Sequence, residues 1–397
     1  MANDQHGYCI LTINGGSSSI KLSVFGKKDD LQLILSGKIE RIGLKDASFR
    51  IRQGDVSSDV NMDVSSFEAA TRSLMEWLQG QSWFGDVKVI GHRIVHGMRH
   101  TASLAVTGDL VKELESIVSY DPAHLPAEVG MVKALSSAYP AMLQVACFDT
   151  AFHADLPAVA STLAIPRSLR EDGVRRYGFH GISYSYLLQQ LRVIDAGVAA
   201  GRVIFAHLGN GASLAAVNGG ACVDTSMGFT PAGGVVMSTR SGDLDPGVAW
   251  YCMQKGMSAS AFNDMINKRS GLLALSGGSP DVRDLLEKEK EDAGAALAID
   301  VFCYHVKKYI GAYTAVLSGL DALIFSGGIG EHAAAIRARI CKDMAFAGIE
   351  LDGGENEKHA VIISAKQSRV KVFVIPTDEE RMIAQEAAAI YEKDAQL

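Results

Sequence analysis

The sequence predicts an α/β protein that is built from two similar halves. Segments typical of strands alternate with segments typical of helices along the chain, which favours α/β architecture. In addition, a strand, a loop of Gly, Asn and Ser and a second strand occur at 8–25 and again at 202–217. We therefore expect a duplicated domain with a cleft between the copies.

The two hairpins can be aligned residue by residue. In this alignment Gly15 falls on Gly209, Ser19 on Ser213 and Ile20 on Leu214. The matches are few, so chance is the alternative to duplication.

The elements outside the hairpins follow the same alternation. Apolar residues three or four positions apart predict helices over 66–80 and 299–317. The remaining predicted strands open the segments 87–97, 142–153, 321–340 and 370–394. The segment 321–340 continues into a helix after a glycine turn, and the segment 370–394 also continues into a helix.

The composition indicates a globular protein of the cytosol. The chain has 397 residues, 48% of them apolar, and a formal net charge of −7. Such a chain can form about two to three domains, and its acidity is not typical of nucleic-acid binders. Its six cysteines form no CxxC pair, so we expect them to be buried or free thiols in a reducing cytosol. We find no signal peptide and no membrane-spanning run, and we expect neither nucleic acid nor membrane as a partner.

The opening loop, NGGSSSIK at 14–21, has the groups that a phosphate site needs. Gly15 and Gly16 allow close approach of the backbone and positive φ, and consecutive N–H groups can surround an anion. Lys21 adds a positive charge. The spacing of a Walker A loop is absent, and a polar hairpin tip without a ligand is the alternative.

Three further motifs place polar residues at the ends of apolar runs. Arg93 in GHRIVHG could hold a carboxylate or phosphate with two N–H groups, although a surface arginine is the alternative. Asp149 in CFDTAFH would need a partner, a metal or a substrate if buried, although it could instead form a turn. His180 in RRYGFHGISY could be catalytic, although a lone histidine is more often structural.

The second half of the chain adds three glycine-rich motifs. These are HLGNGAS at 207–213, a long stretch of Gly, Ser, Thr and Pro around Arg240 at 224–247, and SGGIGEH at 326–332. The last precedes a predicted helix, whose N-terminus could face a nucleotide. Near the C-terminus, Thr377 and Glu380 fit a capping box, which would leave Glu379 free to bind a metal.

Taken together, these motifs resemble the acetate kinase family, which also includes propionate kinases. The motifs occur in the family's order and cover nearly the whole chain. The resemblance implies two ribonuclease-H-like domains of the actin-type ATPase superfamily around a nucleotide cleft. The first would span 1–150 and 382–397, and the second 151–381. It also implies a homodimer that transfers the γ-phosphoryl group of ATP to acetate, with Mg²⁺ (or Mn²⁺), giving acetyl phosphate and ADP reversibly.

The resemblance also implies roles for single residues. Asp149 corresponds to the family's catalytic acid residue and His180 to its transition-state stabiliser. Arg93 and Arg240 correspond to the arginines that hold the carboxylate and the phosphoryl group. The implied metal ligands are Asn14 and Glu379. The implied nucleotide contacts are Lys21, His207, Leu208, Gly209, Asn210, Gly211, Asp281, Val282, Arg283, Gly327, Gly328, Ile329, Gly330 and Glu331. The implied acyl pocket consists of Arg93, Val95, Ala123, His124, Phe179 and Pro231.

The chain departs from the family pattern close to this pocket. Met98 follows His96-Gly97 where the family has a second glycine, and YDPAHLPAE replaces the usual APLHNPAN. Ala123 thus stands for a leucine and Leu125 for an asparagine, which leaves the choice between acetate and propionate open. A sugar kinase and an Hsc70-like ATPase are the alternative functions. The pocket is too apolar for a sugar, and we find no segment for a peptide-binding domain.

Overall fold

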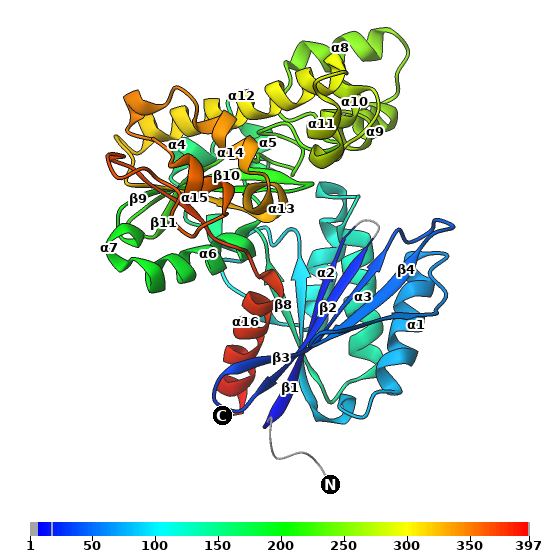
Figure 1. The fold of residues 1–397 in the computed structure, drawn as a ribbon. Coiled ribbons are helices and arrows are strands. Elements are labelled where there is room, and N and C mark those ends of the chain that lie inside the picture. The colour runs from blue at the N-terminus through cyan, green and yellow to red at the C-terminus, as the bar shows by residue number, and fades with distance from the viewer. Residues whose placement is uncertain (1–6, 17–18, 396–397) are drawn as a thin grey trace. The chain divides into compact units, whose positions relative to one another are not determined.

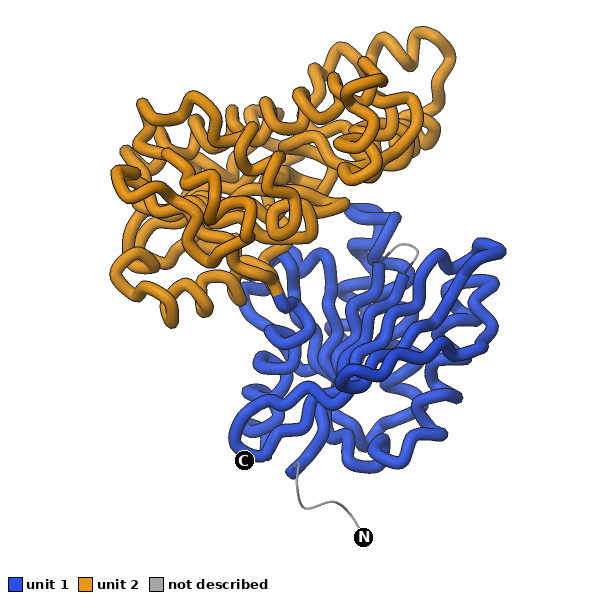
Figure 2. Tube along the Cα trace, in the orientation of Figure 1, with its two compact units in different colours: residues 1–151, 378–397 blue, residues 152–377 orange. Residues whose placement is uncertain are grey.

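The computed structural model describes residues 7–16 and 19–395, and the chain divides into two compact units (Figures 1 and 2). Unit 1 comprises Met1–Ala151 and Asp378–Leu397, and unit 2 comprises Phe152–Thr377. Residues 378–381 thus group with unit 1, whereas the family resemblance implies that they belong to the second domain. They group with unit 1 because they begin a helix that packs on the unit 1 sheet.

Unit 1 is built on an eight-stranded sheet in the order β5-β4-β3-β2-β1-β6-β8-β7. The strands β1, β6 and β8 are parallel, and the other neighbours are antiparallel. The bounds are β1 Tyr8–Gly15, β2 Ile20–Lys27, β3 Leu31–Glu40, β4 Ser48–Gln53, β5 Val56–Val60, β6 Val87–Ile94, β7 Leu104–Ala105 and β8 Leu143–Phe148.

Helices cover both faces of this sheet (Figure 1). On one face, Leu22 of β2 packs in a core with α1 (Phe67–Gln79) and α3 (Leu125–Ala138). The next side chain along the strand points to the opposite face, where Lys21 meets Glu380 of α16 (Glu379–Asp394). A short helix, α2 (Gly108–Ser116), contacts α3.

The helix α16 lies close against the strands β1, β6 and β8. A Cβ atom at Gly91 would lie 2.6 Å from Cγ2 of Ile383. A larger residue at 91 would therefore displace the helix that carries Glu379 and Glu380.

Unit 2 is built on a five-stranded sheet in the order β11-β10-β9-β12-β13. Its strands are β9 Arg202–Leu208, β10 Ala212–Asn218, β11 Ala221–Thr225, β12 Ala322–Ser326 and β13 Lys371–Val374. Its helices are α4 Ala158–Ser161, α5 Arg167–Glu171, α6 Gly181–Ile194, α7 Ala196–Ala199, α8 Pro246–Gln254, α9 Ala259–Lys268, α10 Gly271–Ser276, α11 Val282–Lys288, α12 Ala293–Val316, α13 Gly327–His332, α14 Ala334–Cys341 and α15 Gly353–Glu357. The long helix predicted over 299–317 is α12, and its apolar stripe is buried.

The two sheets share one topology. Strands β3-β2-β1-β6-β8 of unit 1 and β11-β10-β9-β12-β13 of unit 2 both consist of an antiparallel meander followed by two parallel strands. Both predicted hairpins form, but the residue alignment between them is wrong. In the first hairpin, Gly15 pairs with Ile20. If the alignment were right, the corresponding residues of the second hairpin, Gly209 and Leu214, would also pair, but Leu214 pairs with Ala206. The second hairpin has a shorter turn, which shifts its second strand.

Within the part of the chain that the structure describes, no helix is both long enough and apolar enough to cross a membrane.

Candidate active site

Arg93 and Asp149, which the sequence placed at the ends of two apolar runs, meet in unit 1. Strands β6 and β8 are parallel neighbours, and Arg93 lies opposite Cys147, so the two carboxyl ends share one edge of the sheet. Arg93 Nε and Nη2 both donate to Asp149 Oδ2, at 3.0 and 2.5 Å. Asp149 is fully buried. The pair is therefore a buried ion pair, and neither the surface arginine nor the simple turn describes these residues.

Glu128, in the first turn of α3, also contacts this pair, and the sequence analysis missed it. Its Oε2 accepts the Val95 N–H at 2.9 Å, and its Oε1 lies 3.4 Å from Arg93 Nη1. A glutamate in the first turn of a helix is ordinary, since the helix dipole favours it. Nothing in the local pattern therefore signalled that this one points inward.

Burial and charge act in opposite directions on Arg93 and Glu128. For Arg93, attraction to Asp149 and Glu128 outweighs the cost of burial, and its pKa is raised. For Glu128, burial dominates over the favourable Arg93 and Val95 contacts and raises the pKa to about 8. Arg93 thus stays charged, whereas Glu128 can bind a proton near neutral pH.

The predicted pocket residue His124 is held by a second carboxylate that the analysis missed. His124 Nδ1 lies 2.9 Å from both carboxylate oxygens of Asp121, and the Ala123 N–H reaches the same carboxylate at 3.2 Å. The Asp121 contacts fix the turn that leads into α3. Val95, Ala123 and His124 therefore belong to one local arrangement in unit 1.

The predicted metal ligands Asn14 and Glu379 are in contact. Asn14 Nδ2 donates to Glu379 Oε2 at 3.0 Å and to Glu380 Oε1 at 3.3 Å. The amide nitrogen thus donates to the carboxylates, and these side chains offer amide and carboxylate oxygens as a candidate set of metal ligands. Such a set suits Mg²⁺, which prefers one or two carboxylates together with water and phosphate oxygens.

The predicted capping box is wrong. The N-cap of α16 is Asp378, whose side chain accepts the Arg381 N–H at 2.9 Å. Thr377 instead forms a hydrogen bond with Ser183, between Oγ1 and Oγ at 2.7 Å. Asp is as good an N-cap as Thr, and the cap lies one residue later than predicted, so Glu380 has no capping role.

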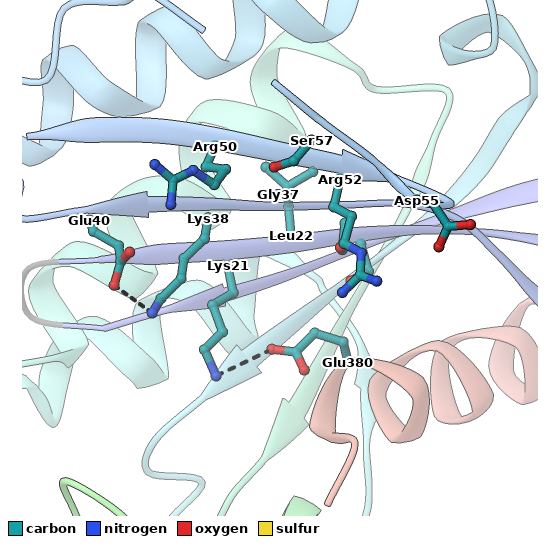
Figure 3. Close-up of a pocket in the computed structure, with 12 residues that line it drawn as sticks. Lys21, Leu22, Gly37, Lys38, Glu40, Arg50, Arg52, Asp55, Ser57 and Glu380 are labelled. Carbon is teal, nitrogen blue, oxygen red and sulfur yellow. Dashed lines mark ion pairs between the residues drawn. The ribbon is translucent and has the colours of Figure 1, made fainter. Parts of the chain in front are cut away.

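Glu380 instead faces Lys21, the charged residue of the opening loop (Figure 3). Lys21 Nζ lies 3.8 Å from Glu380 Oε1, and attraction to Glu380 raises the pKa of Lys21. Of the loop itself, residues 17–18 lie outside the described part. The described part places Asn14 and Lys21 opposite each other in the β1–β2 pair.

A cavity of about 620 Å³ on the face of strands β2–β5 adjoins Lys21 and Glu380 (Figure 3). Its charged lining residues are Lys21, Lys38, Glu40, Arg50, Arg52, Asp55 and Glu380. Four of these residues are basic and three are acidic, and Lys38 pairs with Glu40 at 2.5 Å. The balance of charges favours no particular ligand.

In unit 2, His180 has a strained backbone and a fixed ring. Its φ is 59°, in the left-handed region that non-glycine residues rarely adopt. Its Nδ1 lies 2.9 Å from Ser213 Oγ, and its ring stacks on His207 with centroids 4.4 Å apart. Strain of this kind persists where the surrounding structure holds it, often at functional sites.

His180 and Arg240 both face Gly211 of the second hairpin loop. A Cβ atom at 211 would lie 3.2 Å from His180 Nε2 and 3.6 Å from Arg240 Nη1. The same loop is tied to the Arg240 segment by Ser238, whose N–H donates to the Asn210 carbonyl at 3.2 Å. The structure thus brings together three predicted elements: His180, Arg240 and the 207–211 loop.

The Gly327–Glu331 segment lies beside this loop. Gly327 has a φ of 74°, and a Cβ atom on it would lie 2.7 Å from the Leu208 carbonyl oxygen. The expected glycine turn before a helix is wrong, because α13 itself begins at Gly327. Glu331 Oε1 accepts the N–H group of Gly327 at 2.8 Å, within the segment, and the N–H group of Thr377 at 3.1 Å. The second hydrogen bond ties the segment to the residue that precedes the N-cap of α16.

The remaining predicted contacts have local structural roles. Asp281 is the N-cap of α11, accepts the Arg283 N–H at 2.9 Å and pairs with the exposed Arg283 side chain. Phe179 and Pro231 are buried in unit 2, and the Phe179 carbonyl accepts from His153 Nε2 at 3.0 Å. No contact described in unit 2 links Asp281 or Arg283 to the 207–211 loop.

Comparison with known proteins agrees with the resemblance. Residues 9–385 match the Acetokinase family. The chain is 41% identical to a protein of Methylocella silvestris named acetate kinase, over 98% of this chain and 99% of that one. It is 39% identical to an acetate kinase of Oceanobacillus iheyensis, over 96% and 98% of the two chains.

Two solved structures have the same fold. The acetate kinase of Porphyromonas gingivalis superposes with a TM-score of 0.87 at 35% identity, over 97% of this chain and 100% of that one. A propionate kinase of Francisella tularensis superposes with a TM-score of 0.91 at 35% identity, over 96% and 99%. The predicted α/β fold of the actin-like ATPase type is confirmed. The chain belongs to the acetokinase family, whose members are phosphotransferases that use ATP or ADP as co-substrate.

Proposed function

We propose that this protein transfers the γ-phosphoryl group of ATP to acetate, directly and reversibly, to give acetyl phosphate and ADP. The observation that carries the proposal is the buried Arg93–Asp149 pair, which we assign to the binding of a small carboxylate. The family membership supports the same reaction.

Acetate needs to be positioned for this reaction, and it needs no base. It is fully ionised near neutral pH, so one of its oxygens can attack phosphorus without losing a proton. The obstacle is repulsion between the carboxylate and the phosphoryl oxygens. Arg93 offsets that repulsion at the acceptor, and Asp149 orients Arg93, so we assign Asp149 no proton transfer.

In unit 2, we assign binding of the transferred group to His180 and Arg240. Their Nε2 and Nη1 atoms both face Gly211, and the absence of a side chain there leaves room for phosphate oxygens. Charge on the transferred group spreads over its three outer oxygens in the transition state. Fixed donors stabilise that charge without having to reorganise.

The nucleotide would be bound by the 207–211 and 327–331 segments, with Lys21 at the phosphates. The two segments lie next to each other, since β12 and β9 pair at Ser326 and His207 and Gly327 lies close to Leu208. Asp281, Val282 and Arg283 are our assignment for the adenosine end, on the family resemblance alone.

Asn14 and Glu379 would hold a Mg²⁺ ion, for which Mn²⁺ is the substitute. When bound, the ion would neutralise phosphate charge. Asn14 itself keeps Glu379 and Glu380 oriented through its amide nitrogen.

Propionate is the second candidate acceptor. Ala123 is smaller than the leucine of the family pattern, and a propionate kinase is among the similar structures. An additional methylene contributes about 0.8 kcal/mol when buried, so a small change in the pocket can alter the preference. We place acetate first because the similar sequences cited above are named acetate kinases.

We also expect a cytoplasmic homodimer, as the resemblance implies. Sedimentation velocity at micromolar concentration tests the oligomeric state, and a single species of about 42 kDa would contradict the homodimer.

A coupled assay of ADP release tests the proposed reaction. ADP release should depend on added acetate. Acetyl phosphate should be detectable as the hydroxamate that it forms with hydroxylamine. Glucose in place of acetate is the control for a sugar kinase. ADP release that is independent of acetate would indicate an ATPase and would contradict the proposal.

A further inference from the structure

Glu128 is a buried carboxylate that the proposed reaction does not use. Its side chain is only 1% exposed, and its two oxygens have different partners. Oε2 accepts the Val95 N–H at 2.9 Å, while Oε1 lies 3.4 Å from Arg93 Nη1. The first contact is a normal hydrogen bond, and the second is long.

The contacts of Arg93 show which donor a substrate can obtain most easily. Nε and one of the two N–H groups of Nη2 are committed to Asp149, at 3.0 and 2.5 Å. Nη1 donates to the Gly15 carbonyl at 3.3 Å and to Glu128 at 3.4 Å. The Glu128 contact is the longest of the four. A carboxylate that binds Arg93 with two hydrogen bonds would therefore use the second N–H of Nη2 and replace Glu128 at Nη1, rather than replace Asp149.

The charges around Arg93 make such a replacement depend on a proton. Asp149, Glu128 and an acetate ion would place three carboxylates beside one guanidinium. The nearby Asp121 adds another negative charge, next to His124. Lys21, which also acts electrostatically on Arg93, is offset by Glu379 and Glu380. Buried charges without partners are costly and commonly become neutral by binding a proton.

We propose that Glu128 is a positioning residue that releases Arg93 Nη1 to the substrate carboxylate and that, when it is ionised, takes up one proton from solvent as it does so. The proton adds to Oε1, and Oε2 keeps the Val95 N–H, so the backbone at Val95 stays in place. Acetate remains an anion and is the nucleophile. This inference rests on the proposed function, because it concerns binding of the acceptor that we assign.

The titration of Glu128 supports this linkage. Burial raises its pKa to about 8, so much of the free protein carries the ionised form above that pH. Below pH 7 the carboxyl is mostly protonated, so Arg93 Nη1 can be released without uptake of a further proton. Above pH 8 each binding event has to bring in a proton. Acetate binding should therefore weaken as the pH rises.

The test compares the KM for acetate at pH 7, 8 and 9 in the wild type and in Glu128→Gln, at saturating Mg²⁺ and ATP. Glutamine is isosteric and can still accept the Val95 N–H, but it cannot ionise. The wild-type KM should rise by up to about tenfold from pH 7 to pH 9. The Glu128→Gln KM should stay nearly constant. Glu115→Gln, an exposed carboxylate of α2, is the control and should follow the wild type.

A second measurement needs no variant. Calorimetric titration of acetate into the wild-type protein at pH 8.5, in two buffers of different ionisation enthalpy, gives the number of protons taken up. We expect uptake of a large fraction of one proton. No uptake, or an equal pH-dependent rise of KM in Glu128→Gln, would overturn the proposal. If the proposed function itself is wrong, acetate-dependent ADP release is absent at every pH, which is a different result.

Discussion

Arg93 and Asp149 meet through a single oxygen: Nε and Nη2 of Arg93 both donate to Asp149 Oδ2. The arrangement leaves Asp149 fully buried and Arg93 with an exposed fraction of only 14%. The arginine is thus oriented before any substrate arrives, which is the condition for electrostatic stabilisation without reorganisation.

Arg93→Lys is expected to lower kcat/KM for acetate by about 100-fold, because a lysine cannot reproduce the fork that holds Asp149 and a second carboxylate. The melting temperature should also fall, since Asp149 loses a partner in a buried site. Steady-state kinetics and circular dichroism measure the two effects. Lys112→Arg on the exposed face of α2 is the control. Activity within threefold of wild type would remove Arg93 from the acceptor site.

Glu379→Gln and Glu380→Gln should differ in what they weaken. Glu379→Gln should raise the Mg²⁺ concentration needed for half-maximal activity, because a carboxylate ligand is lost. Glu380→Gln should instead change the KM for ATP, because Glu380 pairs with Lys21. A titration of activity against Mg²⁺ at fixed free ATP separates the two. The opposite pattern would show that the two carboxylates have exchanged roles.

Ala123→Leu should shift the acceptor preference towards acetate. The added side chain fills space beside His124, and pockets that differ by one methylene discriminate by roughly 10- to 200-fold. The measurement is kcat/KM for acetate, propionate and butyrate in both proteins. An unchanged ratio of propionate to acetate would mean that Ala123 does not line the pocket.

Gly211→Ala should reduce kcat strongly while the protein stays folded. The new methyl group would lie 3.2 Å from His180 Nε2 and 3.6 Å from Arg240 Nη1. It would therefore occupy the space that we assign to phosphate oxygens. Gly353→Ala in α15 is a matched control, because a Cβ atom there meets nothing within 4 Å. Equal kcat values for the two variants would contradict the assignment.

Buried neutral histidines should make the protein sensitive to acid. Burial lowers the pKa of His92, His96 and His153 to about 4 from an ordinary value of 6.5. Below pH 6.5 the unfolded chain binds protons that the folded chain does not. The free energy of unfolding should therefore fall between pH 6.5 and pH 4, by about 1.4 kcal/mol per pH unit for each histidine, and histidine should contribute no slope above pH 7.

Urea unfolding at pH 7.5, 6.5 and 5.5 checks this prediction. His92→Gln should have a shallower slope than the wild type, because glutamine can still bond to Gln144 and does not titrate. His332→Gln, whose side chain is 77% exposed, should match the wild type. Identical slopes for all three proteins would contradict the assignment to buried histidines.

Local patterns were sufficient for most of the fold. Apolar spacing predicted α12, and runs of apolar residues bounded by glycine predicted both hairpins, because these signals depend on neighbours in the chain. The sequence also located Arg93 and Asp149 at the ends of two apolar runs, but that these runs are neighbouring parallel strands, which brings the two side chains together, came from the structure. The order of motifs indicated the family, which the comparisons confirmed.

What only the tertiary structure decided depends on contacts between distant segments. The capping box failed because Thr377 has a partner in Ser183, and the alignment of the hairpins failed because their turns differ in length. Glu128 has the sequence context of a solvent-facing helix residue. Packing of α3 against the sheet turns it towards Arg93, and burial there changes its affinity for protons. A short stretch of sequence specifies which groups a residue carries, but burial and distant neighbours set its charge and its partners.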